Sequence, residues 1–390
     1  MSSVRITCVE TFVLSERQAL VRIGTDAGVV GWGEAVAENW ARPTSATVDR
    51  LAPLLIGEDP RRITHLWQAM SRGGFYRGGP LIGSAVAGID QALWDIRGRL
   101  LDAPIHELLG GPTRDSVAVY AHAGMSVDGD YLSDGTLNRA HELAAAGYPL
   151  LKVTVGNEPV GFIEGVEWLE QLLARLRQLR TAVGNGVALA ADFHGRLSVA
   201  QSRRTLGGLE GAGLCFVEEP LRPEHSALIG DIVRSTSIPI ATGERLYQRT
   251  EFRPVLEAGV AIVQPDVSHA GGITETFRIA AQAEVYDASI APHCPLGPVA
   301  LAACLQVDLA VPNFYLQEQV LDLHRDRPPG LEIVGNPEVL RAVDGAVPRL
   351  TGPGLGIDID EDAVRARVAT GALAPGSPQW RHPDGSFAEW

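Results

Sequence analysis

Acidic and histidine side chains recur at regular intervals in the second half of the chain, each at or just after the end of a short apolar run. Taken one per run, they are Asp192, Glu218, Glu244, Asp266, His293 and Glu318, and the intervals between them are 26, 26, 22, 27 and 25 residues. A strand of roughly four to eight residues followed by a loop and a helix occupies about this length. Each residue is therefore predicted to end one strand of a parallel βα repeat. Such repeats close into a barrel, and the C-terminal ends of its strands meet at one mouth, where barrel enzymes hold their catalytic residues.

Asp192, Glu218 and Glu244 end three successive predicted strands, and this set contains no cysteine and no metal-spaced histidine pair. Carboxylate oxygens are hard ligands that suit Mg²⁺, whereas a zinc site normally takes nitrogen or sulfur. The sequence therefore predicts a Mg²⁺ site with room for water and two substrate oxygens. Glu219 directly follows Glu218 and must point to the opposite face of the strand end. We expect it to have a supporting role, although the two glutamates could be exchanged.

A metal ion chelated by an α-hydroxycarboxylate would stabilise the enediolate that forms when the α-proton leaves, and histidine is the natural base for that step. Two histidines are available. His293 ends the seventh strand and Asp266 the sixth, so a hydrogen bond between them would raise the basicity of His293. His194, two residues after Asp192, is then left as the acid. Glu318 would lie beside the substrate carboxylate as a proton donor or hydrogen-bond partner, and the alternative is an ordinary ion pair at the barrel end.

Length and composition fit one barrel with an additional domain. The chain has 390 residues, more than the about 250 of a typical barrel. Its residues are 45% hydrophobic and 21% charged, which is ordinary for a globular protein with a large core. The net charge of −14 argues against nucleic acid and anionic membrane as partners, because both attract basic surfaces.

The cysteines and the N-terminal segment indicate the cellular compartment. The four cysteines show no CxxC spacing, and the chain is too long to need disulfide bonds for its stability. The N-terminal segment has no apolar region of the signal type, and no stretch approaches the length of a membrane-spanning helix. We expect reduced thiols and a cytoplasmic, unsecreted protein.

The first part of the chain is predicted to form an α+β domain of roughly 115 residues. Residues 4–35 indicate strands, with TDAG (25–28) as a hairpin turn. Residues 84–101 indicate a helix that begins at a capping Ser84, with one apolar face formed by Val86, Ile89, Leu93, Ile96 and Leu100.

A glycine-rich loop, GGFYRGGPL (73–81), lies between two of the predicted helices. Glycine pairs allow tight backbone turns. The loop is either a mobile connection or a lid whose Phe75, Tyr76 and Arg77 touch substrate.

With these motifs the chain resembles the enolase superfamily, specifically its mandelate racemase-like branch. The resemblance spans nearly the full chain and is carried by VGWGE (30–34), GIDQALWDIRG (88–98), ADFHGR (191–196), FVEEP (216–220), ATGER (241–245), VQPDVSHAGGIT (263–274), APHCPLGP (291–298), LQEQ (316–319) and PGLGIDIDE (353–361). Within that branch, DFHGR, GFYRGGP, QPDVSHAGGIT, APHCPLGPVALAACL and the terminal AEW are together similar to bacterial D-galactonate dehydratases.

The resemblance implies an α/β fold with three parts. Residues 1–115 would form an N-terminal α+β capping domain. Residues 116–325 would form a modified TIM barrel of the (β/α)7β type that holds the metal and catalytic residues. Residues 326–390 would complete the cap.

The same resemblance implies a reaction and the residues that perform it. Mg²⁺ would be held by Asp192, Glu218 and Glu244. His293, paired with Asp266, would abstract the α-proton, and His194 would protonate the departing β-hydroxyl group. The expected reaction is dehydration of a sugar acid, D-galactonate, to 2-dehydro-3-deoxy-D-galactonate. A symmetric homo-oligomer is also expected.

The end of the second barrel strand differs from the wider branch. Related racemases and cycloisomerases carry Lys-x-Lys there, whereas this chain has Lys152, Val153 and Thr154. The reacting lysine would align with Thr154, so the chemistry should rest on the histidines.

The loops that would select the sugar, at 15–18, 38–44 and 121–126, differ from familiar galactonate dehydratase loops, and roles for Trp40, Arg42 and Arg77 stay open. Three alternatives therefore remain. The first two are dehydration and epimerisation of a different aldonate. The third is a non-catalytic paralogue that only binds ligand.

Overall fold

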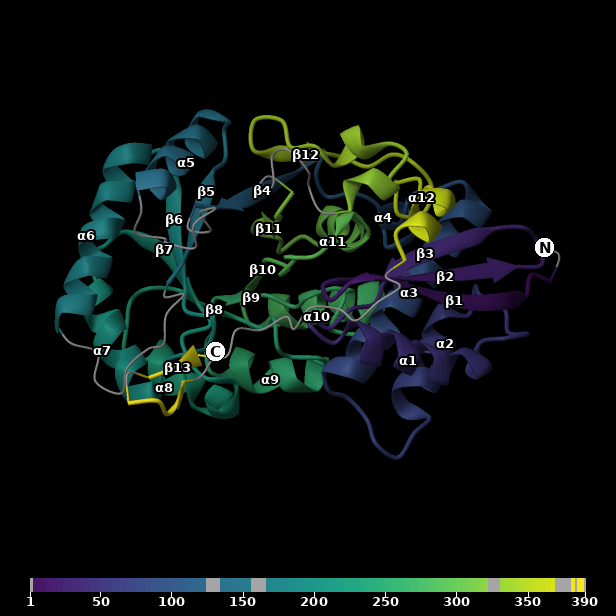
Figure 1. Cartoon of the computed structure of the whole chain (residues 1–390), viewed down its shortest axis with the longest axis horizontal. Coiled ribbons are helices and arrows are strands. Elements are labelled where there is room, and N and C mark those ends of the chain that lie inside the picture. The colour runs from purple at the N-terminus through teal and green to yellow at the C-terminus, as the bar shows by residue number, and fades with distance from the viewer. Residues whose placement is uncertain are drawn as a thin grey trace.

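The structure is a computed structural model that describes residues 3–123, 134–155, 166–321, 330–368, 380–382 and 384–388. A barrel and a smaller α+β cap lie side by side, with the barrel on the left and the cap on the right in Figure 1. Among the described residues, none of the helices has the length and apolar character needed to cross a membrane.

The cap is built on a three-stranded antiparallel sheet of β1 (Ile6–Ser15), β2 (Gln18–Thr25) and β3 (Val30–Glu34). The predicted hairpin turn is confirmed between β2 and β3, where Gly28 has a φ of 74° that favours glycine. Helical segments follow as α1 (Ala41–Leu51), η1 (Ala52–Leu54), α2 (Ile63–Arg72), α3 (Pro80–Leu101) and α4 (Ile105–Leu108). Apolar residues of the sheet and of α1 to α3 form one buried cluster, which is the core of the cap.

Helix α3 joins the cap to the barrel, and most of its residues are buried. It begins at Pro80, four residues before the predicted start, because proline is well suited to the first turn of a helix. The prediction that Ser84 caps this helix is therefore wrong. Ser84 lies inside the helix, and its hydroxyl contacts His269 Nδ1 of the barrel at 2.9 Å.

The barrel contains eight parallel strands in the described part of the chain: β4 (Ser116–His122), β5 (Leu150–Thr154), β6 (Ala188–Asp192), β7 (Leu214–Glu218), β8 (Ile240–Thr242), β9 (Ile262–Val263), β10 (Ser289–Ile290) and β11 (Gln317–Glu318). Strand β11 pairs with β4. The stretch before β11 bonds to β10, with Ile290 N donating to Asn313 O at 2.9 Å and Tyr315 N to Ile290 O at 2.8 Å. These bonds close the sheet on itself.

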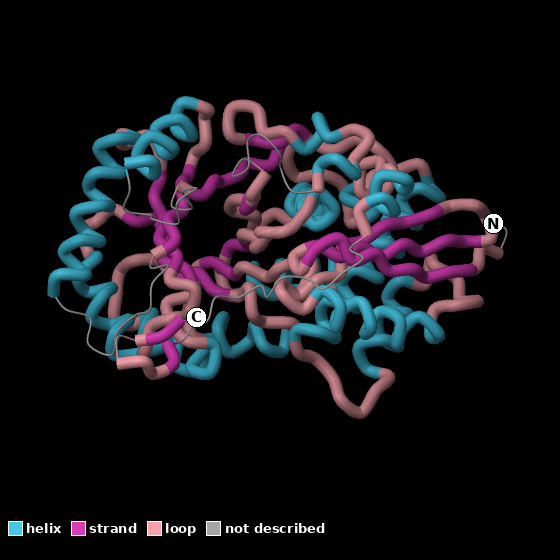
Figure 2. The backbone as a smooth tube through the Cα atoms, in the orientation of Figure 1, coloured by secondary structure: helices cyan, strands magenta, loops and turns pink. Residues whose placement is uncertain are grey.

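Each connection between successive barrel strands contains at least one helical segment. The helical segments are α5 (Asp134–Ala145), α6 (Val166–Val183), α7 (Val199–Leu209), η2 (Pro223–Leu228) with α8 (Ile229–Val233), α9 (Arg249–Glu257), α10 (Gly272–Val285) and α11 (Pro298–Ala310). Figure 2 shows helices on the outer side of the curved sheet. The predicted (β/α)7β barrel with an α+β cap is confirmed. The sequence GFIEGVEWLEQLLARLRQLRTAV (161–183) predicts one helix, and its first residues, 161–165, lie outside the described residues.

An apolar layer inside the barrel explains where the polar mouth begins. Each strand, or the residue next to it, contributes one member: Tyr120, Leu150, Ala190, Phe216, Ala241, Ile262, Ala291 and Leu316. Side chains of a strand alternate between the two faces, so the residue two positions further along points inward again. On seven of the strands, that next inward position holds His122, Lys152, Asp192, Glu218, Gln264, His293 or Glu318. Apolar packing thus closes the barrel below this layer, and the side chains above the layer are mostly polar.

The C-terminal segment contacts both parts of the molecule. After η3 (Leu331–Ile333) and η4 (Pro337–Leu340), strand β12 (Ala346–Pro348) pairs antiparallel with β4 of the barrel. Helix α12 (Glu361–Ala366) reaches the cap, where Glu361 forms an ion pair with Arg22 at 2.8 Å. Strands β13 (Trp380–Arg381) and β14 (Phe387–Ala388) form a hairpin beside the barrel, with Arg196 over the Trp380 ring at 4.3 Å. The division at residues 115 and 325, and the assignment of this segment to the cap, stay predictions.

The close approach of β3 to α3 can be tested by substitution. A Cβ atom at Gly33 would overlap the carbonyl oxygen of Gly88 in α3. We expect Gly33→Ala to lower the free energy of unfolding by about 1 to 3 kcal/mol, because the backbone must move apart. Urea-induced unfolding measures this change. The control is Gly207→Ala in α7, where a Cβ meets no atom within 4 Å, and equal stabilities of the two variants would contradict the packing argument.

Candidate active site

The three predicted metal carboxylates come together at the mouth of the barrel. Asp192 and Glu218 are the last residues of β6 and β7 and stand opposite each other in the strand register. Glu244 follows β8 by two residues. The side chains of Asp192 and Glu218 are 1% exposed and that of Glu244 is 12% exposed. Three carboxyl groups are therefore held near one another, two of them fully buried and the third largely buried.

Lys152 on β5 is a cation in contact with two of these carboxylates, Asp192 and Glu218. Its Nζ lies 2.6 Å from Glu218 Oε1, 2.9 Å from Glu318 Oε1 and 3.4 Å from Asp192 Oδ2. Burial alone would lower the pKa of this ammonium, but the surrounding carboxylates raise it well above its ordinary value. Lys152 is therefore charged and belongs to the site. Sequence reasoning named Lys152 only in the comparison with Lys-x-Lys and missed this role.

One ammonium group does not balance the negative charge of the site. Burial raises the pKa of Glu218 to about 8, and the neighbouring Asp192 carboxylate adds to the rise. Burial also raises the pKa of Glu244, whose Oε2 is buried without a hydrogen-bond partner. A further cation at this position would satisfy that oxygen and keep the carboxylates ionised.

The arrangement fits a hard divalent cation by its donor chemistry. Among the described residues, no group of three or more His, Cys, Asp or Glu side chains already stands around one point as ligands would. Asp192 and Glu218 contact Lys152 Nζ instead. Carboxylates on three adjacent strands, one with an unsatisfied oxygen, are nevertheless the oxygen-rich set that Mg²⁺ takes. Metal binding requires the three side chains to turn toward a common point.

His293 and Asp266 form the predicted pair. His293 Nδ1 lies 2.8 Å from Asp266 Oδ2, while Nε2 faces the mouth 3.4 Å from Glu244 Oε2. Although burial lowers the pKa of His293, the nearby carboxylates Glu244, Glu318 and Asp266 raise it well above its ordinary value. The same carboxylates thus favour the imidazolium that a base becomes after it accepts a proton.

His194 stands at the rim, next to Asp192. Its Nε2 lies 3.0 Å from Asp192 Oδ2, and its backbone N–H donates to Asp192 Oδ1 at 2.8 Å. The backbone of His194 has a φ of 49°, a left-handed conformation in which histidine is among the more tolerant residues. With its side chain 29% exposed, His194 has the access to solvent that an acid needs to recover its proton.

Glu318 is more heavily bonded than the sequence suggested. It accepts hydrogen bonds from the backbone N–H of Cys294 at 2.9 Å and from Lys152, and its Oε1 lies 2.6 Å from His122 Nε2. Burial raises the pKa of Glu318, but Lys152 and His293 outweigh it and hold the pKa well below its ordinary value. This environment favours an ionised acceptor over a proton donor.

Two further residues at the mouth were missed by sequence reasoning. His122 ends β4 and, besides its contact with Glu318, leaves its buried Nδ1 without a hydrogen-bond partner. Gln264 donates from Nε2 to Glu218 Oε2 at 2.7 Å. The strand alternation described above is the signal that could have found both, because each lies two residues beyond a member of the apolar layer.

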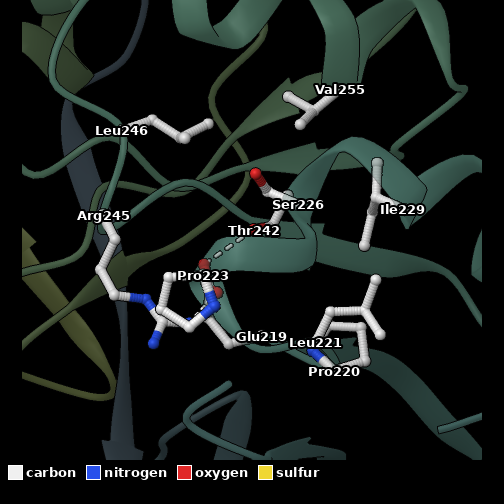
Figure 3. Close-up of a pocket in the computed structure, with 10 residues that line it drawn as sticks. All are labelled: Glu219, Pro220, Leu221, Pro223, Ser226, Ile229, Thr242, Arg245, Leu246 and Val255. Carbon is white, nitrogen blue, oxygen red and sulfur yellow. Dashed lines mark hydrogen bonds and ion pairs between the residues drawn. The ribbon is translucent and has the colours of Figure 1, made fainter. Parts of the chain in front are cut away.

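Glu218 and Glu219 have separate partners, as expected for side chains on opposite faces. Glu219 Oε1 accepts from the Thr242 hydroxyl at 2.7 Å and from the backbone N–H of Gly243 at 2.9 Å, and its Oε2 pairs with Arg245. Figure 3 shows Glu219, Thr242 and Arg245 in a pocket that is also lined by apolar side chains such as Leu246 and Val255. Glu219 therefore supports the loop that carries Glu244.

The glycine-rich loop between α2 and α3 turns toward solvent. The side chains of Phe75 and Tyr76 pack edge to face against each other, and the two residues are 92% and 85% exposed. Arg77 Nε donates to Gly74 O within the loop at 3.0 Å. In this structure the loop is an exposed connection, not a closed lid. Residues 124–126 of the first strand-end loop lie outside the described residues.

Comparisons with known proteins agree with this fold. The sequence profile of the mandelate racemase / muconate lactonizing enzyme N-terminal domain matches residues 5–110, and that of the enolase C-terminal domain-like family matches residues 136–363. A D-galactonate dehydratase from Ralstonia nicotianae is 46% identical over 392 residues, which cover 99% of this chain and all of that protein.

Solved structures show the same architecture. A mandelate racemase/muconate lactonizing enzyme from Jannaschia sp. CCS1 superposes with a TM-score of 0.87 at 28% identity, covering 94% of this chain and 98% of the other. A member of the enolase superfamily from Salmonella Typhimurium gives 0.86 at 28% identity, covering 93% and 98%. The chain belongs to the mandelate racemase/muconate lactonizing enzyme family of the enolase superfamily. Membership implies a divalent metal ion.

Proposed function

We propose that the protein is a Mg²⁺-dependent hydro-lyase that converts D-galactonate to 2-dehydro-3-deoxy-D-galactonate. The observation that carries this proposal is the pair of histidines at one barrel mouth: His293 held by Asp266 at 2.8 Å, and His194 beside Asp192 at 3.0 Å. Elimination of water needs a base at the α-carbon and an acid at the β-hydroxyl group, and these two groups can supply both. The full-length similarity to a D-galactonate dehydratase supports the choice of sugar acid.

Asp192, Glu218 and Glu244 are proposed to hold the Mg²⁺. When bound, the ion supplies a Lewis acid that acidifies the α-proton of a coordinated carboxylate. Lys152 lies next to these residues, and its ammonium group is a donor that can orient the substrate carboxylate. Glu318 holds Lys152 in place through an ion pair of 2.9 Å.

The protein side chains then move two protons. His293 Nε2 takes the α-proton, since its Nδ1 is held by Asp266 and only Nε2 faces the mouth. His194 gives a proton to the β-hydroxyl group, which leaves as water, and the resulting enol tautomerises to the 2-keto acid. Thr154, buried on β5, occupies the position where related racemases carry the reacting lysine, so both proton transfers rest on the two histidines.

We also propose a cytoplasmic homo-oligomer. The four cysteines are free, as expected in a reducing compartment. The exposed Phe75 and Tyr76 give the surface an apolar feature that a partner copy could cover.

The substrate is tested by a panel of aldonates. The purified protein with Mg²⁺ is expected to release a 2-keto acid from D-galactonate, and the reaction should stop when EDTA removes the metal. Keto-acid formation is followed by semicarbazone absorbance. Product from a stereoisomer but not from galactonate would overturn the substrate, and epimerisation without keto acid would overturn the reaction. Failure with every aldonate would favour a ligand-binding paralogue.

Exchange of the substrate α-proton with solvent deuterium distinguishes the roles of the two histidines. His293→Asn is expected to lower exchange of the α-proton by on the order of 100-fold or more, because the base is gone. His194→Asn should still exchange that proton but lose dehydration. Proton NMR of galactonate in D₂O measures the exchange. If His194→Asn alone abolished exchange, the base and the acid would be assigned the wrong way round.

A further inference from the structure

The loop between β9 and α10 carries a histidine, His269, that faces the cap. His269 follows Asp266 by three residues, and its backbone N–H donates to Asp266 O at 3.0 Å. Its Nε2 lies 3.1 Å from Glu38 Oε2, in the cap loop after β3. Its Nδ1 lies 2.9 Å from the hydroxyl of Ser84 in α3. The ring is buried, and each of its two nitrogens contacts a group from the cap.

The same ring reaches the proposed base through Asp266. His269 Nε2 lies 3.6 Å from Asp266 Oδ2, the oxygen that contacts His293 Nδ1 at 2.8 Å. The other oxygen of Asp266 accepts the backbone N–H of Ser268 at 2.6 Å. Four side chains of alternating charge therefore run from the cap into the mouth: Glu38, His269, Asp266 and His293.

The cap holds this loop along its whole length. Helix α3 approaches so closely at Gly83 that a Cβ there would lie 2.5 Å from His269 O. Gln91 Nε2 donates to Ser268 Oγ at 3.1 Å, and Trp67 Nε1 donates to Gly271 O at 2.7 Å. The position of Asp266 is thus set from the cap as well as from the barrel.

The charges of these four side chains compensate one another. Burial alone would lower the pKa of His269, but Asp266 and Glu38 raise it to about 9. His269 in turn holds the pKa of Glu38 below its ordinary value, against the effect of burial. The His269 ring therefore stands as a cation between Glu38 and Asp266, and the Asp266 oxygen that faces it, Oδ2, also contacts His293 Nδ1.

We propose that His269 is a positioning residue for the base, through which Glu38 and Ser84 of the cap hold Asp266 in the orientation that aligns His293. The base is then competent only while the cap loop at Glu38 is in place over the mouth. This inference rests on the proposed dehydratase function, in which His293 takes the α-proton.

The kinetic test compares two variants with a matched control. His269→Asn and Glu38→Gln are each expected to lower kcat on the order of 10-fold, as loss of an outer partner does, with KM changed by less than about threefold. A primary isotope effect with 2-deuterated galactonate should become larger, because proton abstraction is slowed. Trp94→Phe is the control. It removes another hydrogen bond between cap and barrel, from Trp94 Nε1 to Thr274 Oγ1 at 2.9 Å, and should leave kcat within about twofold.

A spectroscopic measurement reads the positioning without substrate. The His293 Nδ1 proton, hydrogen-bonded to Asp266, is expected far downfield in the proton NMR spectrum and is assigned by its loss in His293→Asn. It should shift or vanish in His269→Asn and Glu38→Gln and stay in Trp94→Phe. Glu38→Gln keeps the inference testable if His269→Asn does not fold.

Each contrary outcome has a distinct meaning. A raised KM with unchanged kcat in Glu38→Gln would show that Glu38 binds substrate, and it would overturn the inference. An unchanged downfield signal in both variants would overturn it as well. Wild-type protein that converts no aldonate would overturn the proposed function alone, since the NMR signal still decides whether His269 positions the pair.

Discussion

The burial of several carboxylates at one barrel mouth is the constraint on which the rest of the structure depends. Asp192, Glu218 and Glu318 are buried, and the side chain of Glu244 is 12% exposed. Ionised groups in such an environment are costly unless cations or hydrogen bonds compensate them. Lys152 compensates two of them directly. The remaining carboxylates raise the pKa of His293, and in the proposed function they would also attract the divalent cation. The proposed metal binding and proton abstraction therefore share one electrostatic origin.

The fold supplies this cluster by simple geometry. Parallel strands end at one mouth, and alternation along each strand places a polar residue two positions beyond an apolar layer. The apolar layer excludes water from below, and the cap lies against the β9 to α10 loop, where α3 approaches His269 at Gly83. The residues around the base are thus held by two structural units that are distant in sequence.

The sequence predicted the barrel, the cap and the strand-end residues, because their signals are local: an apolar run, a polar end and a regular interval. It did not predict contacts that depend on pairing between distant segments. Lys152 and His122 meet Glu318 only when β11 closes the barrel against β4. Ser84 looked like a helix cap because its partner, His269, is 185 residues away. The metal carboxylates remain a prediction, since Asp192 and Glu218 contact Lys152 in this structure while Glu244 Oε2 lies 3.4 Å from His293 Nε2.

The most direct test of this account is Mn²⁺ binding measured by electron paramagnetic resonance, with Mg²⁺ as competitor. We expect one Mn²⁺ per chain in the wild-type protein, and binding weakened at least about 10-fold in Glu218→Gln. Glu219→Gln, which changes the neighbouring residue with separate partners, should bind within a few-fold of wild type. Unchanged binding in Glu218→Gln, or loss of binding only in Glu219→Gln, would contradict the assignment of the barrel-mouth carboxylates as the metal site.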